Sequence, residues 1–136
     1  GWDDILLEEL KRPDIYLSAL SPMKSACFAQ FCFMVKIGIF EKVGLFGEEW
    51  KYGHEELDYM VRMHLAGVKW VNVGTDDCPE FYHAGIQSKK EMFDNEDEWS
   101  RYNQESRALF DAKWKHLGTI EDFLVGTYNQ VGNNKR

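Results

Sequence analysis

The sequence predicts an α/β fold in which a mixed sheet is flanked by helices. Residues 14–20 alternate between two side-chain faces, as a half-buried strand does. Residues 26–35 are apolar on both alternating faces except at Gln30, which is typical of a strand covered on both sides. Residues 54–65 instead carry apolar side chains at helical spacing. Strands and helices that alternate in this way form the layers of α/β proteins.

The first elements are bounded by proline. Residues 2–11 have the spacing of a helix, with the apolar side chains Ile5, Leu6, Leu7 and Leu10 toward one side. Pro13 ends this helix because proline cannot continue the hydrogen-bonding pattern. Residues 14–20 then read as a strand, which ends at the Ser21-Pro22 pair.

The middle of the chain predicts a short helix, an acidic loop and a longer helix. Residues 37–43 form the short helix, and Gly44 closes it. Residues 54–65 form the longer helix, with Gly67 at the position of a C-terminal cap. Its apolar stripe is expected to hold Leu57, Met60, Val61, His64 and Leu65, which makes His64 a core histidine.

The remainder predicts two short strands and further helix. Residues 69–73 and 80–83 read as strands, residues 88–114 as a charged helical segment, and residues 119–128 as a final short helix. We expect two parts: residues 1–118 form the α/β unit, and residues 119–136 form a helical extension with a flexible tail.

Composition excludes some functions. The net charge of −7 over 136 residues argues against a nucleic-acid partner, because phosphate contacts need clustered Lys and Arg. No apolar run approaches the roughly 20 residues of a membrane-spanning helix. The three cysteines, Cys27, Cys32 and Cys78, form no paired spacing. They predict reduced thiols in a reducing, cytoplasmic compartment.

Three carboxylates crowd the start of the longer helix: Glu55, Glu56 and Asp58. The helix dipole favours negative charge there, so they could simply stabilise the helix start. Asp58 and Arg62 are four residues apart and are expected to pair on the exposed side. Glu56 lies beside the apolar stripe, where the dipole keeps it ionised and a cleft could form. A shielded carboxylate at that place can accept a proton from an attacking hydroxyl.

The surrounding residues resemble family 2 glycosyltransferases of the GT-A fold. Those proteins have a G-x-F-D-E loop, an E-D-x-D-L-x-x-R helix start, a later glycine, and a strand that ends in histidine before glycine and serine. The matching residues here are Gly44-Leu45-Phe46-Gly47-Glu48, Glu55-Glu56-Leu57-Asp58 with Arg62, then Gly67, Tyr82-His83, Gly85 and Ser88. The order and spacing agree over residues 26–88, about half the chain.

The resemblance implies roles for individual residues. Glu56 occupies the position of the catalytic base of inverting members, with Glu in place of the usual Asp, and Glu55 is the second candidate. His83 occupies the position of a ligand to the Mn or Mg ion that neutralises the departing diphosphate. Gly47 replaces the usual Asp of the loop, which removes an acceptor contact from that position. A hydrogen-bonded structural histidine is the alternative for His83.

Other residues near the motif are candidates for substrate binding. Trp50 and Tyr52 could stack on the apolar face of an acceptor sugar, or could anchor the core. Asp58 is a further candidate for binding the acceptor. Ser88 and Lys89 follow His83 and could approach the diphosphate, although a solvated helix end is the alternative.

The sequence contains no Gly-rich strand-to-helix turn and no D-x-D motif, which the resemblance places in the donor-binding half. We therefore expect the C-terminal, acceptor-side half of a glycosyltransferase. The whole enzyme would transfer a sugar from a nucleotide-sugar, with UDP as the favoured nucleotide, to a hydroxyl of a glycan or other acceptor, in an inverting and metal-dependent reaction. The isolated chain would be inactive, and unpaired sheet edges would favour self-association. The alternative is a non-catalytic module that binds carbohydrate or protein.

Overall fold

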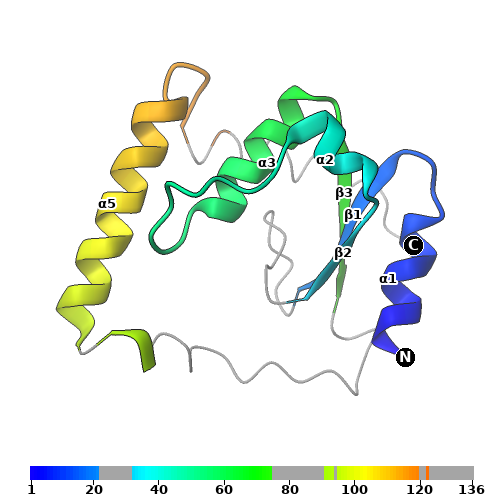
Figure 1. Ribbon diagram of the computed structural model, residues 1–136, viewed down its shortest axis with the longest axis horizontal. Helices are drawn as coiled ribbons and strands as arrows, with labels where there is room; N and C mark the ends of the chain where they lie inside the picture. Colours follow the sequence, from blue (N-terminus) through cyan, green and yellow to red (C-terminus); the bar gives the residue numbers. More distant parts are fainter. Residues whose placement is uncertain (22–31, 75–90, 94, 120–121, 123–136) are drawn as a thin grey trace.

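A small mixed sheet lies between helices in the computed structural model, which describes residues 1–21, 32–74, 91–93, 95–119 and 122 (Figure 1). The chain order is α1 (Trp2–Leu10), β1 (Ile15–Ser21), β2 (Phe33–Val35), α2 (Gly38–Val43), α3 (Glu55–Leu65), β3 (Lys69–Gly74) and α5 (Glu96–Trp114). The α/β class and the mixed sheet expected from the sequence are therefore confirmed for this part of the chain.

The sheet has the order β2-β1-β3. β1 pairs antiparallel with β2, with Leu17 opposite Val35, and parallel with β3, with Leu20 opposite Val73. In the described residues β2 and β3 are thus the outer strands. Self-association through a sheet edge stays a prediction, because neighbouring segments lie outside those residues.

The two faces of the sheet are covered by different helices, as the alternation of side chains requires. Leu17 and Ala19 pack with Trp70 against α2 and α3, together with Phe33 and Val35. Leu20 faces the other way, toward Leu6 of α1, with Met34 and Val73 beside it. β2 is therefore covered on both sides, as the sequence predicted for its part of residues 26–35.

Glycines follow the last residues of α2 and α3. Gly44 has φ 84° and closes α2, its N–H donating to the carbonyl of Phe40 at 3.0 Å. Gly67 has φ 66° beyond α3, and its N–H donates to His64 while that of Val68 donates to Met63. This pair of bonds is a Schellman motif, which satisfies the last carbonyls of the helix. Both predicted stops are confirmed.

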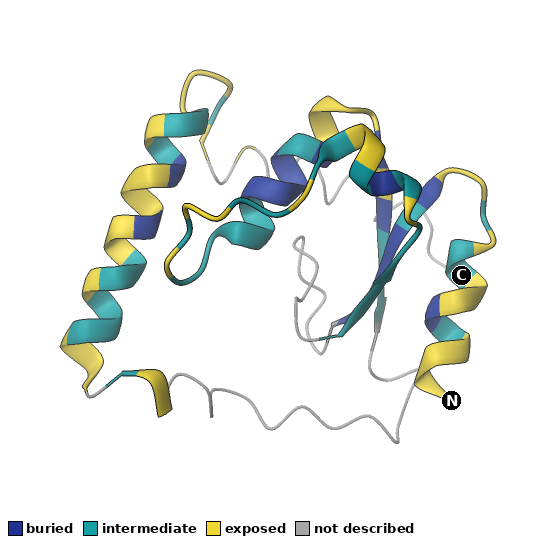
Figure 2. Ribbon diagram, viewed as in Figure 1, coloured by how far each residue is buried: buried dark blue, intermediate teal, exposed yellow. Residues whose placement is uncertain are grey.

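α3 is covered from two sides, which corrects the predicted stripe. Tyr59, Met60 and Met63 pack toward the sheet, whereas Val61 packs against Phe110 of α5. Figure 2 shows buried residues in the middle of α3 and along β1. His64 is exposed and not a core histidine, and Leu65 is 56% exposed.

α5 begins at Glu96; in the earlier part of the predicted segment 88–114, residues 91 and 92 are helical, and residues 88–90 and 94 lie outside the described residues. The Asn95 side chain caps it by accepting a hydrogen bond from the N–H of Glu98 at 2.9 Å. The predicted strand at 80–83 and most of the predicted helix at 119–128 fall outside the described residues, as does the tail. In the described part of the chain, no helix combines the length and apolar character needed to cross a membrane.

Candidate functional site

The start of α3 is held in an unusual backbone conformation. Gly53 has φ 74° and His54 has φ 71°, so two consecutive residues are left-handed. Glycine adopts this conformation freely, but histidine does so at a cost. His54 precedes the helix without a capping hydrogen bond from its side chain. Burial lowers the pKa of His54, and the nearby Arg107 charge lowers it further. Strain of this kind persists where the surroundings fix the backbone, often beside a functional site.

An open hollow of about 330 Å³ lies beside this helix start. Its lining residues are Phe33, Phe46, Gly47, Trp50 and Glu55. The ring of Phe46 stacks on Tyr59 of α3 with centroids 4.1 Å apart, and Phe33 lies 6.2 Å from Phe46 at a tilted angle. Packed rings of this kind give the hollow rigid apolar walls with one carboxylate among them.

The two candidate bases differ in position. Glu55, which the sequence placed second, is the one that lines the hollow. Glu56 is half-buried, and burial raises its pKa, as does repulsion from Glu55, although backbone hydrogen bonds at the helix start oppose the shift. Desolvation therefore opposes the effect of the helix dipole, which was expected to keep Glu56 ionised. Its role as the base stays a prediction.

Trp50 lines the hollow with a buried N–H group. Its Nε1 atom is closed to solvent, and no described residue accepts a hydrogen bond from it. The ring lies 6.5 Å from that of Phe110, and the Lys113 ammonium is 5.6 Å from its centroid. Trp50 is thus a packing residue that also lines the hollow, and its stacking on a sugar stays a prediction.

The structure explains the glycine at position 47. A Cβ atom there would lie 2.8 Å from Trp50 Nε1 and would collide with the carboxylate of Glu49. Any side chain, including the Asp of the resembled loop, would therefore displace these groups.

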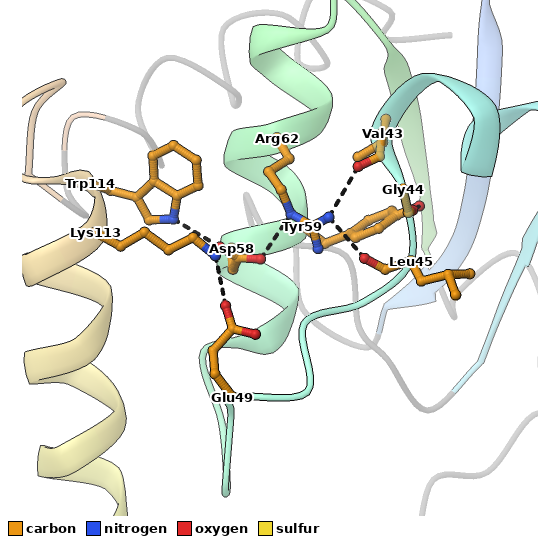
Figure 3. Close-up of polar contacts among 9 residues, drawn as sticks. All are labelled: Val43, Gly44, Leu45, Glu49, Asp58, Tyr59, Arg62, Lys113 and Trp114. Atoms are coloured by element: carbon orange, nitrogen blue, oxygen red, sulfur yellow. Dashed lines mark hydrogen bonds and ion pairs between the residues drawn. The ribbon is translucent and has the colours of Figure 1, made fainter.

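Asp58 is the centre of a buried polar network and has no exposed surface (Figure 3). Its Oδ2 accepts from Arg62 Nε at 2.9 Å. Its Oδ1 accepts from Trp114 Nε1 at 2.9 Å and lies 2.8 Å from Lys113 Nζ. The predicted pair with Arg62 is confirmed, but its place on the exposed side is wrong because α5 covers it. Both oxygens are engaged within the protein, which favours a structural role over the predicted acceptor contact.

The same network holds the loop that carries the hollow. Arg62 Nη1 donates to the carbonyls of Val43 and Leu45 at 3.0 and 2.8 Å, and the Tyr59 hydroxyl donates to Gly44 at 2.9 Å. Lys113 Nζ also donates to Glu49 Oε1 at 2.7 Å. Figure 3 shows Lys113 reaching from α5 to Glu49 and Asp58, with Arg62 on the other side of Asp58. Side chains of α3 and α5 therefore both hold the loop through hydrogen bonds.

Tyr52 is held by its backbone and by its ring. Its carbonyl accepts from Ser106 Oγ at 2.8 Å, and its ring meets Phe93 edge-on at 4.8 Å. Tyr52 is not among the residues that line the hollow. These contacts favour the anchoring role, and its contact with an acceptor stays a prediction.

The predicted metal and diphosphate residues cannot be placed. His83, Ser88 and Lys89 lie outside the described residues. Within those residues, no group of three His, Cys, Asp or Glu side chains could hold a metal ion. The acids at the start of α3 therefore do not by themselves form a cation site, and the metal prediction depends on His83.

Sequence reasoning missed several residues that build the site. Phe33 and Phe46 lie on separate elements, so only the fold brings them to one hollow. Lys113 and Trp114 contact Asp58 from more than 50 positions away in the chain, without a local signal. The aromatic content of the loop was the one available hint.

Comparison with known proteins gives no relative. No protein-family model matches the chain, and no curated protein or solved structure is significantly similar to it.

Proposed function

We propose that this chain is the acceptor-side part of a GT-A nucleotide-sugar glycosyltransferase, with the acceptor bound in the hollow beside α3. The observation that carries the proposal is the placement of Glu55, a carboxylate at the start of a helix, in a hollow walled by aromatic rings. The mixed sheet and the motif from Gly44 to Arg62 are consistent with it.

The chemistry suits sugar transfer to a hydroxyl. The rings of Phe46 and Trp50 offer apolar surfaces to the C–H face of an acceptor sugar. Glu55 can accept the hydroxyl proton while the oxygen attacks the anomeric carbon of the donor. The bond from that carbon to the diphosphate breaks, and the nucleoside diphosphate leaves with the electron pair. Attack opposite the leaving group inverts the anomeric configuration.

Geometry favours Glu55 over Glu56 as the base. A general base must first reach the proton that it removes, and only then does its pKa matter. Glu55 lines the hollow, whereas Glu56 is not among the described lining residues. The raised pKa of Glu56 would suit a base, so Glu56 is the alternative if the acceptor approaches from elsewhere.

In this proposal, the residues of the hollow bind neither the donor nor the metal ion. In the proposal, the UDP-sugar binds to a separate donor-binding half, and His83 is a ligand of the Mn or Mg ion. When bound, the ion would neutralise charge on the diphosphate. No step on the acceptor side depends on it.

The test is turnover by the complete protein that carries this chain. Release of UDP from UDP-sugars is measured with wild type, Glu55→Gln and Glu56→Gln. We expect Glu55→Gln to lose at least about 100-fold in kcat, the usual effect of removing a general base, and Glu56→Gln to stay within about tenfold. Full turnover by Glu55→Gln would contradict the assignment.

A non-catalytic carbohydrate-binding module remains the second candidate, because the aromatic hollow needs no metal to hold a sugar. Saccharide binding without UDP release from any UDP-sugar, by the complete protein with Mn or Mg present, would favour the module over the enzyme.

A further inference from the structure

We propose that His54 is a pH-sensitive contact between α5 and the loop of residues 51–54, which leads into α3. The neutral imidazole holds the loop on α5, and the imidazolium releases it. The loop joins Trp50 to Glu55, which both line the hollow, so release acts on the backbone beside the candidate site. The inference goes beyond the proposed sugar transfer and does not depend on it.

The loop of residues 51–54 is also bound to α5 by polar contacts. Figure 1 shows α5 beside the loop that precedes α3. Lys51 Nζ lies 3.4 Å from Glu105 Oε2, and the Ser106 hydroxyl donates to the carbonyl of Tyr52 at 2.8 Å. The Lys51 pair is exposed and therefore contributes little. The loop thus depends mainly on the Ser106 hydrogen bond and on the packing of the residue that follows Gly53.

That residue is His54, whose ring packs against α5. Its ring centroid lies 6.2 Å from that of Phe110, which is itself buried against Val61 of α3. The Nδ1 atom of His54 is closed to solvent, and no described residue forms a hydrogen bond with it. An imidazolium donates from both of its nitrogens. Protonation would therefore bury a charged donor without an acceptor, which is costly as long as the ring stays on α5.

The charges around His54 come from both helices. Burial lowers the pKa of His54, and the Arg107 charge on α5 lowers it further. Three groups oppose this shift without reversing it: Glu55 on α3, Asp111 on α5 and the Gly53 backbone. The packed ring is thus harder to protonate than an exposed histidine, whose pKa is about 6.5.

The direction of the pH effect follows from this shift. Release exposes the ring and restores its ordinary pKa, so the released state takes up the proton first as the pH falls. The contact is fully present above about pH 6.5 and weakens as the pH falls through that value toward the pKa of the packed ring.

The backbone at His54 favours release in the same way. Its φ of 71° is left-handed, which costs energy in a residue other than glycine. Such strain persists only while the surroundings fix the backbone. When the ring leaves α5, this constraint is lost and the backbone can relax. The contact is therefore a weak point of the structure, where a single charge shifts the balance.

Hydrogen–deuterium exchange of α5 in the complete protein tests this contact. Protection of the α5 amides is measured between about pH 7.5 and 5.5, on either side of the ordinary histidine pKa, and corrected for the intrinsic exchange rate at each pH. His54→Asn tolerates a left-handed backbone and stays uncharged. Over this range, we expect wild-type protection to fall about threefold or more relative to His54→Asn.

A matched variant controls for the loss of any histidine. His64 lies on the same helix and is exposed, so His64→Asn should follow wild type. Protection that changes in parallel in wild type and His54→Asn would overturn the inference. The same holds if His64→Asn behaves like His54→Asn.

A second measurement needs no variant. When the imidazole protons of the wild type are titrated by NMR, at least one of the four histidines should titrate at lower pH than the exposed His64 and His116. If all four titrate together, the inference is wrong. Neither measurement involves turnover. Their failure would leave the proposed sugar transfer standing, and a complete protein that releases no UDP would leave this contact standing.

Discussion

Lys113 offers the sharpest test of how the site is held. Its ammonium lies between two carboxylates, 2.7 Å from Glu49 Oε1 and 2.8 Å from Asp58 Oδ1. Partial burial disfavours its charge, but hydrogen bonds to Asp58 and Glu49 outweigh this and raise the pKa of Lys113. Lys113→Met keeps an unbranched apolar side chain of similar length and removes the ammonium group, with its charge and its hydrogen-bond donors. The variant leaves Asp58 buried with fewer partners.

The expected cost follows from what Asp58 retains. Removing one partner of a buried ion pair costs about 3–5 kcal/mol when the other charge is left alone. Here Arg62 and Trp114 still donate to Asp58, and the Lys113 side chain is 34% exposed. We therefore expect about 2 kcal/mol, close to the value of one hydrogen bond to a charged group. For a chain of this size that lowers Tm by about 8 °C.

The assay is urea denaturation at pH 7, followed by tryptophan fluorescence and checked by circular dichroism. Lys115→Met is the matched control, since Lys115 lies two residues further on and is exposed. We expect that control to stay within about 0.5 kcal/mol of wild type. If Lys113→Met is no less stable than Lys115→Met, the buried network does not hold α5 on α3 as argued.

Three further changes probe the loop and the start of α3. Because burial raises the folded pKa of Glu56 above its ordinary value, ionisation opposes folding; Glu56→Gln should be more stable than wild type at pH 7, and the difference should shrink as the pH falls and vanish once the pH is well below 4.5, in urea titrations across this range. His54→Val should be about 1–2 kcal/mol less stable than His54→Asn, because a β-branched residue fits φ 71° poorly; equal stabilities would refute the strain. Gly47→Ala should lose about 1–2 kcal/mol and weaken glycoside binding, because the added Cβ meets Trp50 Nε1 and the Glu49 carboxylate, whereas unchanged calorimetry would contradict that geometry.

The local parts of the fold could be predicted from the sequence. Alternation identified β1, and the glycines at 44 and 67 marked helix ends because their positive φ angles favour glycine. The face of α3 could not be predicted in the same way. A single apolar stripe assumes one covering surface, but the sheet and α5 cover different sides of α3. His64 and Asp58 were misplaced for that reason.

The site was predictable only where its residues are neighbours in the chain. The acidic helix start and Trp50 lie within a few residues of each other, and both border the hollow through Glu55 and Trp50. The choice between Glu55 and Glu56 depends on which side chain meets Phe33 and Phe46, and that depends on tertiary packing. The engagement of Asp58 by α5 likewise depends on a contact between distant segments.

The central claim is that a sugar hydroxyl lies beside Glu55 in the aromatic hollow. A crystal structure of the complete protein with a bound methyl glycoside tests this directly. We expect the sugar ring to lie against Phe46 and Trp50, with one hydroxyl within about 3 Å of the Glu55 carboxylate. A glycoside bound elsewhere, or bound in the hollow without a hydroxyl near Glu55, would contradict it.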